Sequence, residues 1–131
     1  MTYFLDTNVC ITLLKGSPAV ARELLAHAIS EIGLPAIVAS ELLVGAAKSA
    51  RAPDNLTAVR AFLRPLTVAP FDYECAERYA TVRAGLERAG TTIGPHDLLI
   101  AATVLTANGT LVTHNLREFS RVPDLRVVDW E

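Results

Sequence analysis

The sequence predicts an α/β fold, a three-layer α/β/α domain in which helices flank a central, mostly parallel sheet. Short apolar runs alternate along the whole chain with longer segments of helical periodicity. The connections between them are short and rich in glycine, proline and asparagine, which favours crossover connections in a parallel sheet. At 131 residues the chain has the length of one domain, so we expect residues 1–131 to form a single unit.

In the first half of the chain, glycine and proline separate the expected elements. Gly16 ends the first helix, Pro18 fits the first turn of the next, and Asp54 or Asn55 can cap a later one. We expect strands at residues 2–5, 33–38 and 66–69, and helices at 8–15, 18–28, 40–49 and from 54 or 55 to about 64.

The second half follows the same alternation. Asp72 opens the longest helix, which ends at Gly90, a common helix terminator. A very apolar helix then runs from residue 96 to about 107, and Asn108 with Gly109 turns the chain into the next strand. We expect the last elements to be a strand at 110–113, a helical turn at 116–120 and a strand at 126–128.

The composition excludes several classes of protein. With 51% hydrophobic residues and a mean hydropathy of +0.33, the chain is too apolar for a disordered segment. No apolar run reaches the roughly 18–20 residues of a membrane span, and no basic residue precedes the first apolar run as in a signal peptide. Cys10 and Cys75 are isolated thiols, so we expect a reducing, cytoplasmic location. The net charge of −2 excludes a polycation that wraps nucleic acid.

Three carboxylates stand at strand ends or helix starts of the expected fold. Asp6 directly follows the first strand, Glu41 lies in the first turn of its expected helix, and Asp97 opens the very apolar helix. Each could instead cap a helix or complement its dipole. In parallel sheets, however, ligands bind beyond the carboxyl ends of the strands, where these three positions converge. The pattern therefore predicts an acidic site at that edge.

An acidic site without His or Cys ligands indicates hard cations. Oxygen ligands select Mg²⁺ or Mn²⁺, which activate water and stabilise the charge that develops when a phosphodiester is cleaved. A glycosidase carboxylate pair is the alternative, but a single Trp offers few surfaces for sugar stacking. His96 and His114 could border the pocket.

Four blocks of the sequence resemble PIN-domain ribonucleases of the VapC toxin type. They are FLDTN at residues 4–8, SELLVG at 40–45, GPHDLLIA at 94–101, and LVTHNLREF at 111–119 followed by VDW at 128–130. The resemblance covers essentially the whole chain, in order and at the spacing of the family. It implies a PIN-like fold and a Mg²⁺- or Mn²⁺-dependent RNA endonuclease, the toxin of a type II toxin–antitoxin pair.

The resemblance also implies roles for individual residues. Asp6 and Asp97 correspond to metal ligands, and Glu41 completes the acidic catalytic site by orienting or deprotonating the attacking water. The fourth catalytic position, often Asp in the family, is Asn115 here, as in a subgroup that also has a Thr-x-Asn sequence. Because a neutral amide adds a ligand oxygen but no charge, we expect one divalent ion to bind well and a second poorly.

The resemblance further implies partners. These are a single-stranded or loop RNA substrate, with tRNA among the candidates, and a VapB-like antitoxin through which DNA is bound indirectly. We expect a homodimer or a toxin–antitoxin hetero-oligomer, no membrane association, and an antitoxin helix seated on the helices at 8–15 and 18–28. One alternative is a catalytically weak PIN-like binding module that acts through antitoxin pairing. Another is a receiver-like regulator, but the chain lacks the adjacent acids that such proteins carry after their first strand.

Overall fold

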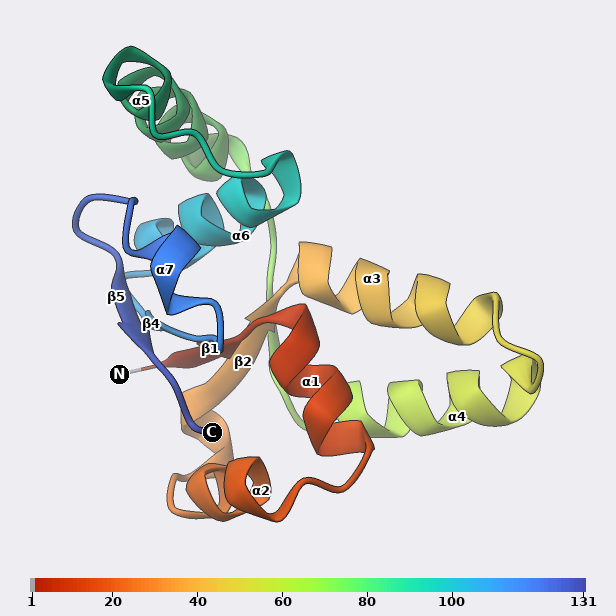
Figure 1. The fold of residues 1–131 in the computed structure, drawn as a ribbon. Coiled ribbons are helices and arrows are strands. Elements are labelled where there is room, and N and C mark those ends of the chain that lie inside the picture. Colours follow the sequence, from red (N-terminus) through yellow and green to blue (C-terminus); the bar gives the residue numbers. More distant parts are fainter. Residues whose placement is uncertain (1) are drawn as a thin grey trace.

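The computed structural model describes residues 2–131 and contains a five-stranded sheet (Figure 1). The strand order is β3-β2-β1-β4-β5, and every described pair of neighbouring strands is parallel. The predicted parallel sheet is therefore confirmed. The strands are β1 (Tyr3–Leu5), β2 (Ile32–Pro35), β3 (Thr67–Ala69), β4 (Thr110–Val112) and β5 (Arg126–Val128).

Helices lie on both sides of this sheet. In Figure 1, α5, α6 and α7 lie on one side of the strands and α1 and α2 on the other, whereas α3 and α4 form a hairpin that projects beyond the carboxyl end of β1. The helices are α1 (Thr7–Leu14), α2 (Pro18–Leu25), α3 (Ala36–Ala47), α4 (Ala52–Leu63), α5 (Tyr73–Ala89), α6 (Pro95–Thr106) and α7 (Leu116–Phe119), and a short 3₁₀ helix covers Ile29–Glu31.

The core lies between the central strands and the apolar faces of the helices. Leu5, Leu34 and Leu111, from three neighbouring strands, have no exposed surface. Helix α6 contributes six buried residues, as its nearly continuous apolar sequence predicts. Its first turn therefore lies at the carboxyl edge of the sheet on a firmly packed helix, which positions the side chains that begin it.

The boundary between β2 and α3 differs from the prediction. The strand ends at Pro35 and the helix begins at Ala36, four residues before the expected start at Ser40. Ile37 and Val38 carry β-branched side chains typical of strands, but α3 is packed in the core, where burial outweighs their weak preference. Glu41 is consequently the sixth residue of its helix and not part of the first turn.

Helix α4 also begins earlier than predicted. It starts at Ala52, with Pro53 in its first turn, so neither Asp54 nor Asn55 is the cap. Proline is tolerated there because the first turn needs no backbone donor. Asp54 instead forms an ion pair with Arg51 at 3.0 Å.

Two further expectations concern thiols and membrane spans. Cys10 and Cys75 are both free and buried. Within residues 2–131, no helix combines the length and the apolar character needed to cross a bilayer.

Gly33 is required where β2 pairs with β3. A Cβ atom at this position would lie 2.6 Å from the backbone oxygen of Thr67. We expect Gly33→Ala to lower the free energy of unfolding by about 1–3 kcal/mol, because the strand backbone must shift. Urea denaturation measures this loss. The matched control is Gly85→Ala in α5, where a Cβ meets nothing within 4 Å and helix propensity favours alanine. Equal effects of the two substitutions would contradict the steric argument.

Candidate functional site

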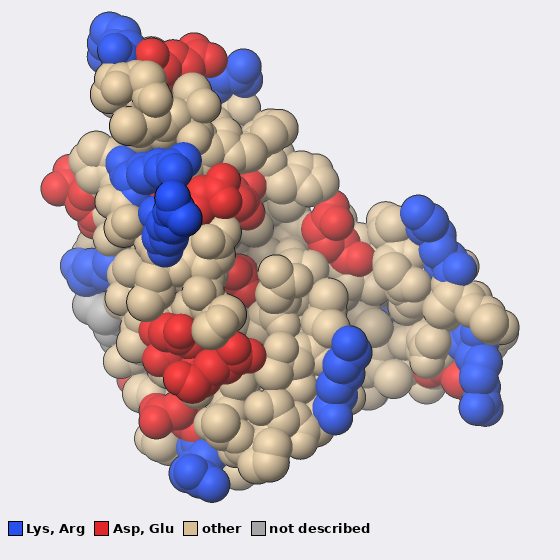
Figure 2. Space-filling view, viewed as in Figure 1, with Lys and Arg blue, Asp and Glu red and all other residues tan. Residues whose placement is uncertain are grey.

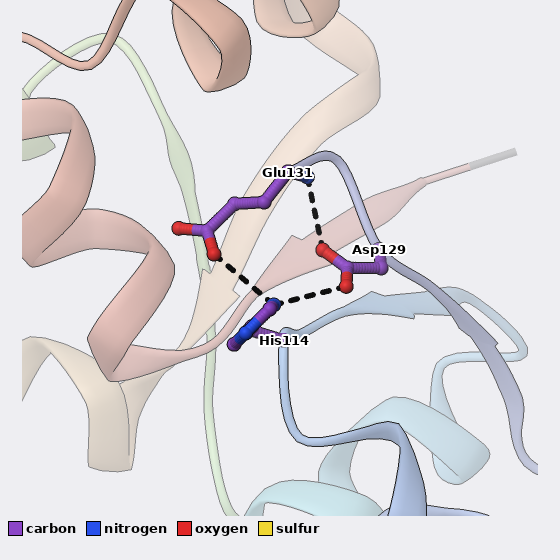
Figure 3. Close-up of side chains that lie close together, drawn as sticks. All are labelled: His114, Asp129 and Glu131. Atoms are coloured by element: carbon purple, nitrogen blue, oxygen red, sulfur yellow. Dashed lines mark hydrogen bonds and ion pairs between the residues drawn. The ribbon is translucent and has the colours of Figure 1, made fainter.

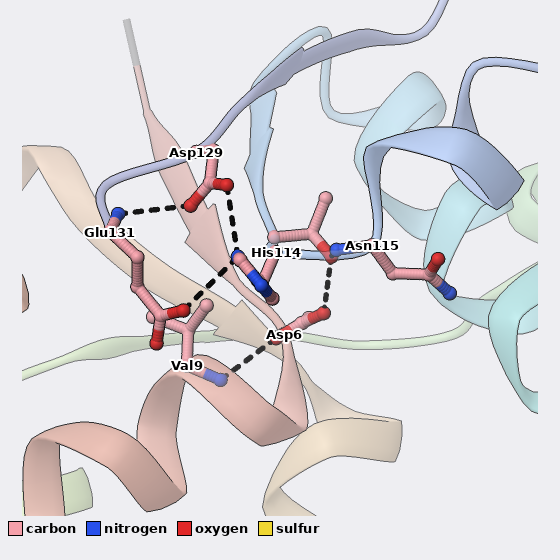
Figure 4. A network of polar contacts seen from close by, with 7 residues as sticks. Asp6, Val9, His114, Asn115, Asp129 and Glu131 are labelled. Atoms are coloured by element: carbon pink, nitrogen blue, oxygen red, sulfur yellow. Dashed lines mark hydrogen bonds and ion pairs between the residues drawn. The ribbon is translucent and has the colours of Figure 1, made fainter.

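Asp6 is fixed at the point where β1 passes into α1. Its side chain is 6% exposed, and each carboxylate oxygen accepts one hydrogen bond (Figure 4). The backbone N–H of Val9 donates to Oδ1 at 2.9 Å, and the hydroxyl of Thr113 donates to Oδ2 at 2.6 Å. Asp6 therefore caps helix α1, which was the alternative to a functional role in the sequence analysis. Through Thr113, the residue after β4, it also faces the carboxyl edge of that strand. The same side-chain position caps the helix and places the carboxylate at the edge of the sheet.

Burial dominates the electrostatics of Asp6. It raises the pKa of this carboxyl above its usual range, although the hydrogen bonds from Thr113 and Val9 oppose the shift. Burial, with a further contribution from the Asp6 carboxylate, also raises the pKa of the neighbouring Cys10 thiol, which makes it an inert core residue. A negative charge at Asp6 is thus costly unless a cation compensates it.

Asp97 lies half-buried in the first turn of α6. Burial is the largest cause that raises its pKa, followed by the negative charges of Glu118 and Asp6. The imidazole of His96 acts in the opposite direction. Asp97 therefore lies within electrostatic range of Asp6 and Glu118, and we call this group of three carboxylates the acidic hollow. Within residues 2–131, no Lys or Arg forms an ion pair with Asp6 or Asp97.

Glu118 is a member of the hollow that the sequence analysis missed. Its Oε1 accepts from the backbone N–H of Gly94 at 3.3 Å, and its Oε2 accepts from the side-chain amide of Asn115 at 3.0 Å. These two hydrogen bonds, the Asn115 bond first, lower the pKa of Glu118 and keep it charged. The signal was the spacing of Asn115 and Glu118, three residues apart at the start of a helix, which is typical of capping pairs.

The position of Glu118 corrects the charge count of the site. Three acids and the neutral Asn115 were expected, but Glu118 adds a carboxylate beside Asp97. The Asn115 amide nitrogen donates to Glu118, and its backbone N–H donates to the Thr113 hydroxyl at 3.0 Å. Asn115 thus holds two other groups of the site in place.

Glu41 lies at the margin of this hollow. Its Oε1 is 3.2 Å from Nδ1 of His96, the residue before Asp97. In the described part of the chain it forms no hydrogen bond or ion pair with Asp6 or Asp97. Asp97 thus lies within electrostatic range of Asp6, whereas Glu41 is linked to the pair through its contact with His96 at the start of α6.

A second cluster borders the hollow on the β5 side. Nδ1 of His114 lies 3.0 Å from Oδ2 of Asp129 and 3.0 Å from Oε2 of Glu131 (Figure 3). Trp130 anchors this segment, since its ring is 7% exposed and stacks on His27 at a centroid distance of 5.3 Å. In residues 2–131, this is the one group of three His, Cys, Asp or Glu residues with ligand atoms all within 4.8 Å of one another.

A pocket of about 360 Å³ joins this cluster to Asp6. Its lining residues are Asp6, Asn8, Val9, Thr12, His114, Asn115 and Glu131. Figure 2 shows Asp and Glu side chains gathered between α7 and the C-terminal end of the chain, with further acidic side chains beside α3. Two carboxylates that are far apart in the sequence, Asp6 and Glu131, therefore line a space that is large enough for a hydrated divalent cation.

An apolar groove leads away from Glu41. It lies between α1, α3 and α4, measures about 420 Å³, and is lined by Ile11, Leu14, Lys15, Glu41, Leu42, Gly45, Ala46, Asn55, Ala58 and Val59. The expected groove was formed by α1 and α2, whereas this one has α1 as one wall and the α3–α4 hairpin as the other. The open space beside Gly45 gives the groove its depth.

Comparison with known proteins bears directly on this site. Residues 3–125 match the family described as PIN domain. The chain is 38% identical to the tRNA(fMet)-specific endonuclease VapC of Salmonella typhimurium, over 99% of the chain and 98% of that protein. It is 37% identical to Ribonuclease VapC2 of Rickettsia felis, over 100% of the chain and 99% of that protein.

Solved structures agree with these relationships. The DNA-bound VapBC of Salmonella typhimurium contains a chain that superposes with a TM-score of 0.94 at 37% identity, covering 100% of this chain and 99% of that one. VapBC2 of Rickettsia felis, bound to a DNA fragment from its promoter, gives a TM-score of 0.91 at 36% identity and covers both chains completely. The fold and the full length of the chain are thus shared with VapC ribonucleases.

Proposed function

The chain belongs to the PIN-domain family, and from this premise we propose that it is a Mg²⁺- or Mn²⁺-dependent endoribonuclease, the toxin of a VapBC-type toxin–antitoxin module. The full-length relatives named ribonuclease or endonuclease support the reaction. One structural observation carries the metal dependence. The carboxylates of Glu118 and Asp6 lie close enough to Asp97 to raise its pKa, and no described Lys or Arg forms an ion pair with Asp6 or Asp97.

The residues of the hollow fit a hard divalent cation. Every candidate ligand is an oxygen, as Mg²⁺ and Mn²⁺ prefer. Asp6 and Asp97 would hold the ion, because the Asp6 oxygens have lone pairs beyond the hydrogen bonds that they accept from Val9 and Thr113. When bound, the cation supplies charge neutralisation at the scissile phosphate and an activated water.

The protein positions the reacting groups by hydrogen bonds. Thr113 fixes Asp6, and Asn115 fixes Glu118 beside Asp97. Glu41, oriented by His96, would accept a proton from the attacking water. The amino end of α6, which lies at the same edge, favours a phosphate through its free backbone N–H groups.

The substrate is a single-stranded or loop RNA, and tRNA is the first candidate to test. The Salmonella typhimurium relative is named a tRNA(fMet)-specific endonuclease, and the two chains align over nearly their full lengths. A splayed loop can place its backbone in an acidic hollow that a regular helix cannot enter.

A VapB-like antitoxin is the proposed protein partner. The groove between α1, α3 and α4 is lined mainly by apolar side chains, and Ile11 and Leu14 on its wall are 37% and 40% exposed. Such a groove suits the apolar face of an amphipathic helix. Because the groove ends at Glu41, a basic side chain of that helix would reach the acids. DNA binding, as in the solved VapBC complexes, would come through the antitoxin, in a homodimeric toxin or a hetero-oligomer.

Growth assays test both the toxin and its partner. We expect induction of the protein to arrest growth and co-expression of the small neighbouring reading frame to restore it. Leu14→Glu should preserve the arrest but weaken the rescue, because it places a charge in the apolar groove. The matched control is Leu25→Glu on α2, where leucine is 83% exposed outside the groove. Equal rescue of both variants would contradict the docking site, and absence of arrest would contradict the toxin.

A further inference from the structure

We propose that Arg117 and Lys15 anchor the RNA backbone on opposite sides of the acidic hollow, an inference that rests on the proposed ribonuclease function. The hollow itself repels phosphates, and the chain carries a net charge of −2. Substrate binding therefore requires local positive charge at positions flanking the acids.

Many basic side chains are already engaged within the protein. Arg51 pairs with Asp54, Arg83 contacts Glu87 and Tyr79, Arg121 donates to the backbone oxygen of Thr92, and Arg126 donates to Asn108 and Gly109. The side chains of Arg117 and Lys15 form no hydrogen bond or ion pair in the described part of the chain. Both residues are exposed, so each can bind a phosphate without breaking an existing contact.

The two residues lie on elements that border the hollow. Arg117 is in α7, directly before Glu118 and two residues after Asn115, whose side chains are hydrogen-bonded to each other. Lys15 ends α1 and lines the groove that contains Glu41. Figure 2 shows basic side chains over α7 on one side of the acidic groups and another beside α1 on the other side. An RNA strand that is bound by both Arg117 and Lys15 would therefore pass over the acidic hollow.

The chemistry of the two side chains differs. The guanidinium of Arg117 can bind a phosphate with two parallel hydrogen bonds, whereas the Lys15 ammonium acts as a point charge. We therefore expect Arg117→Ala to weaken RNA binding about tenfold and Lys15→Ala about threefold. Phosphates carry no sequence information, so both losses should be the same for RNAs of different sequence.

Binding is measured apart from cleavage by fluorescence anisotropy. The probe is a labelled single-stranded RNA oligonucleotide, and Asp97→Asn is the background of every variant, so that the probe stays intact. The association constant K falls as the KCl concentration rises. Titrations at several KCl concentrations should show that each substitution reduces the magnitude of the slope of log K against log [KCl] by about 0.7. The matched controls are Lys48→Ala, directly after the end of α3, and Arg22→Ala in α2, both exposed basic residues without a described side-chain partner. They should change affinity by less than about twofold.

The outcomes separate this inference from the proposed function. If the wild-type protein cleaves RNA but Arg117→Ala and Lys15→Ala weaken binding no more than the controls, the anchors are wrong and the nuclease stands. In otherwise wild-type protein, each substitution should raise KM and leave kcat within about twofold of the wild-type value. The reason is that the lost contact holds the substrate equally well in the ground state and in the transition state. If the wild-type protein cleaves no RNA in the presence of Mg²⁺ or Mn²⁺, the nuclease proposal fails and this inference fails with it.

Discussion

Asp97→Asn should reduce RNA cleavage by about a thousandfold or more while leaving the protein folded. The substitution removes a charge from a side chain that we propose as a metal ligand, and a bound cation contributes several kcal/mol of transition-state stabilisation. Asp6→Asn should have the same effect. Single-turnover cleavage of a labelled RNA measures the loss.

The fold should tolerate Asp97→Asn because the neighbouring carboxylates disfavour a negative charge at this position. The pKa of Asp97 is raised by burial and by neighbouring carboxylates, so the folded state favours the neutral acid. Its contribution to stability is full below its ordinary pKa and is lost as the pH rises through the raised value. A neutral asparagine avoids that loss. In EDTA at pH 7, Asp97→Asn should therefore unfold at the same temperature as the wild type or a higher one.

Asp124→Asn is the matched control for this substitution. Asp124 is exposed, and its φ of 66° is one that asparagine adopts readily. It lies in the turn before β5 and lines none of the acidic hollow. Cleavage by this variant should remain at the wild-type level. If Asp97→Asn cleaves as fast as Asp124→Asn, Asp97 is not part of the active site.

The sequence pattern predicted those parts of the fold in which local signals agree. The run of apolar residues into Asp6 identified both a central strand and the carboxylate at its end. The apolar sequence after Asp97 identified a buried helix. In both cases the apolar pattern and the residues that bound the element predict the same secondary structure. The acidic edge could therefore be placed by the rule that parallel strands end together.

The boundary of α3 could not be predicted in this way. Ile37 and Val38 suit a strand by propensity, and only the packing of α3 against its neighbours makes them helical. The consequence reaches the site, because Glu41 then lies deeper in its helix. Its described partner is His96 from α6, a contact between segments 55 positions apart that no local pattern encodes.

Glu118 and the His114 cluster were missed for the same physical reason. Glu118 joins the site because it accepts hydrogen bonds from Asn115 and from Gly94, which is 24 residues away. His114 meets Asp129 and Glu131 because β4 and β5 are neighbours in the sheet. These groupings arise from tertiary structure. The only local signal for either grouping was the three-residue spacing of Asn115 and Glu118 at the start of a helix.

Removal of the divalent ion should have the largest effect of all. The acids of the hollow repel a phosphodiester, so we expect a cation to be needed to neutralise the charge that develops at the scissile phosphate. The ion should also stabilise the fold, because it binds the assembled site and not the unfolded chain. Mn²⁺ should therefore raise the unfolding temperature of the wild type but not that of the Asp6→Asn, Asp97→Asn double variant.

The most direct measurement is cleavage of one labelled single-stranded RNA by protein stripped of metal with EDTA. Cleaved ends are counted on a denaturing gel before and after Mg²⁺ or Mn²⁺ is added in excess over the chelator. We predict no cleavage in EDTA and full recovery with either ion, with Asp124→Asn recovering and Asp97→Asn failing to recover. Undiminished cleavage in EDTA would contradict a metal-dependent active site at Asp6 and Asp97.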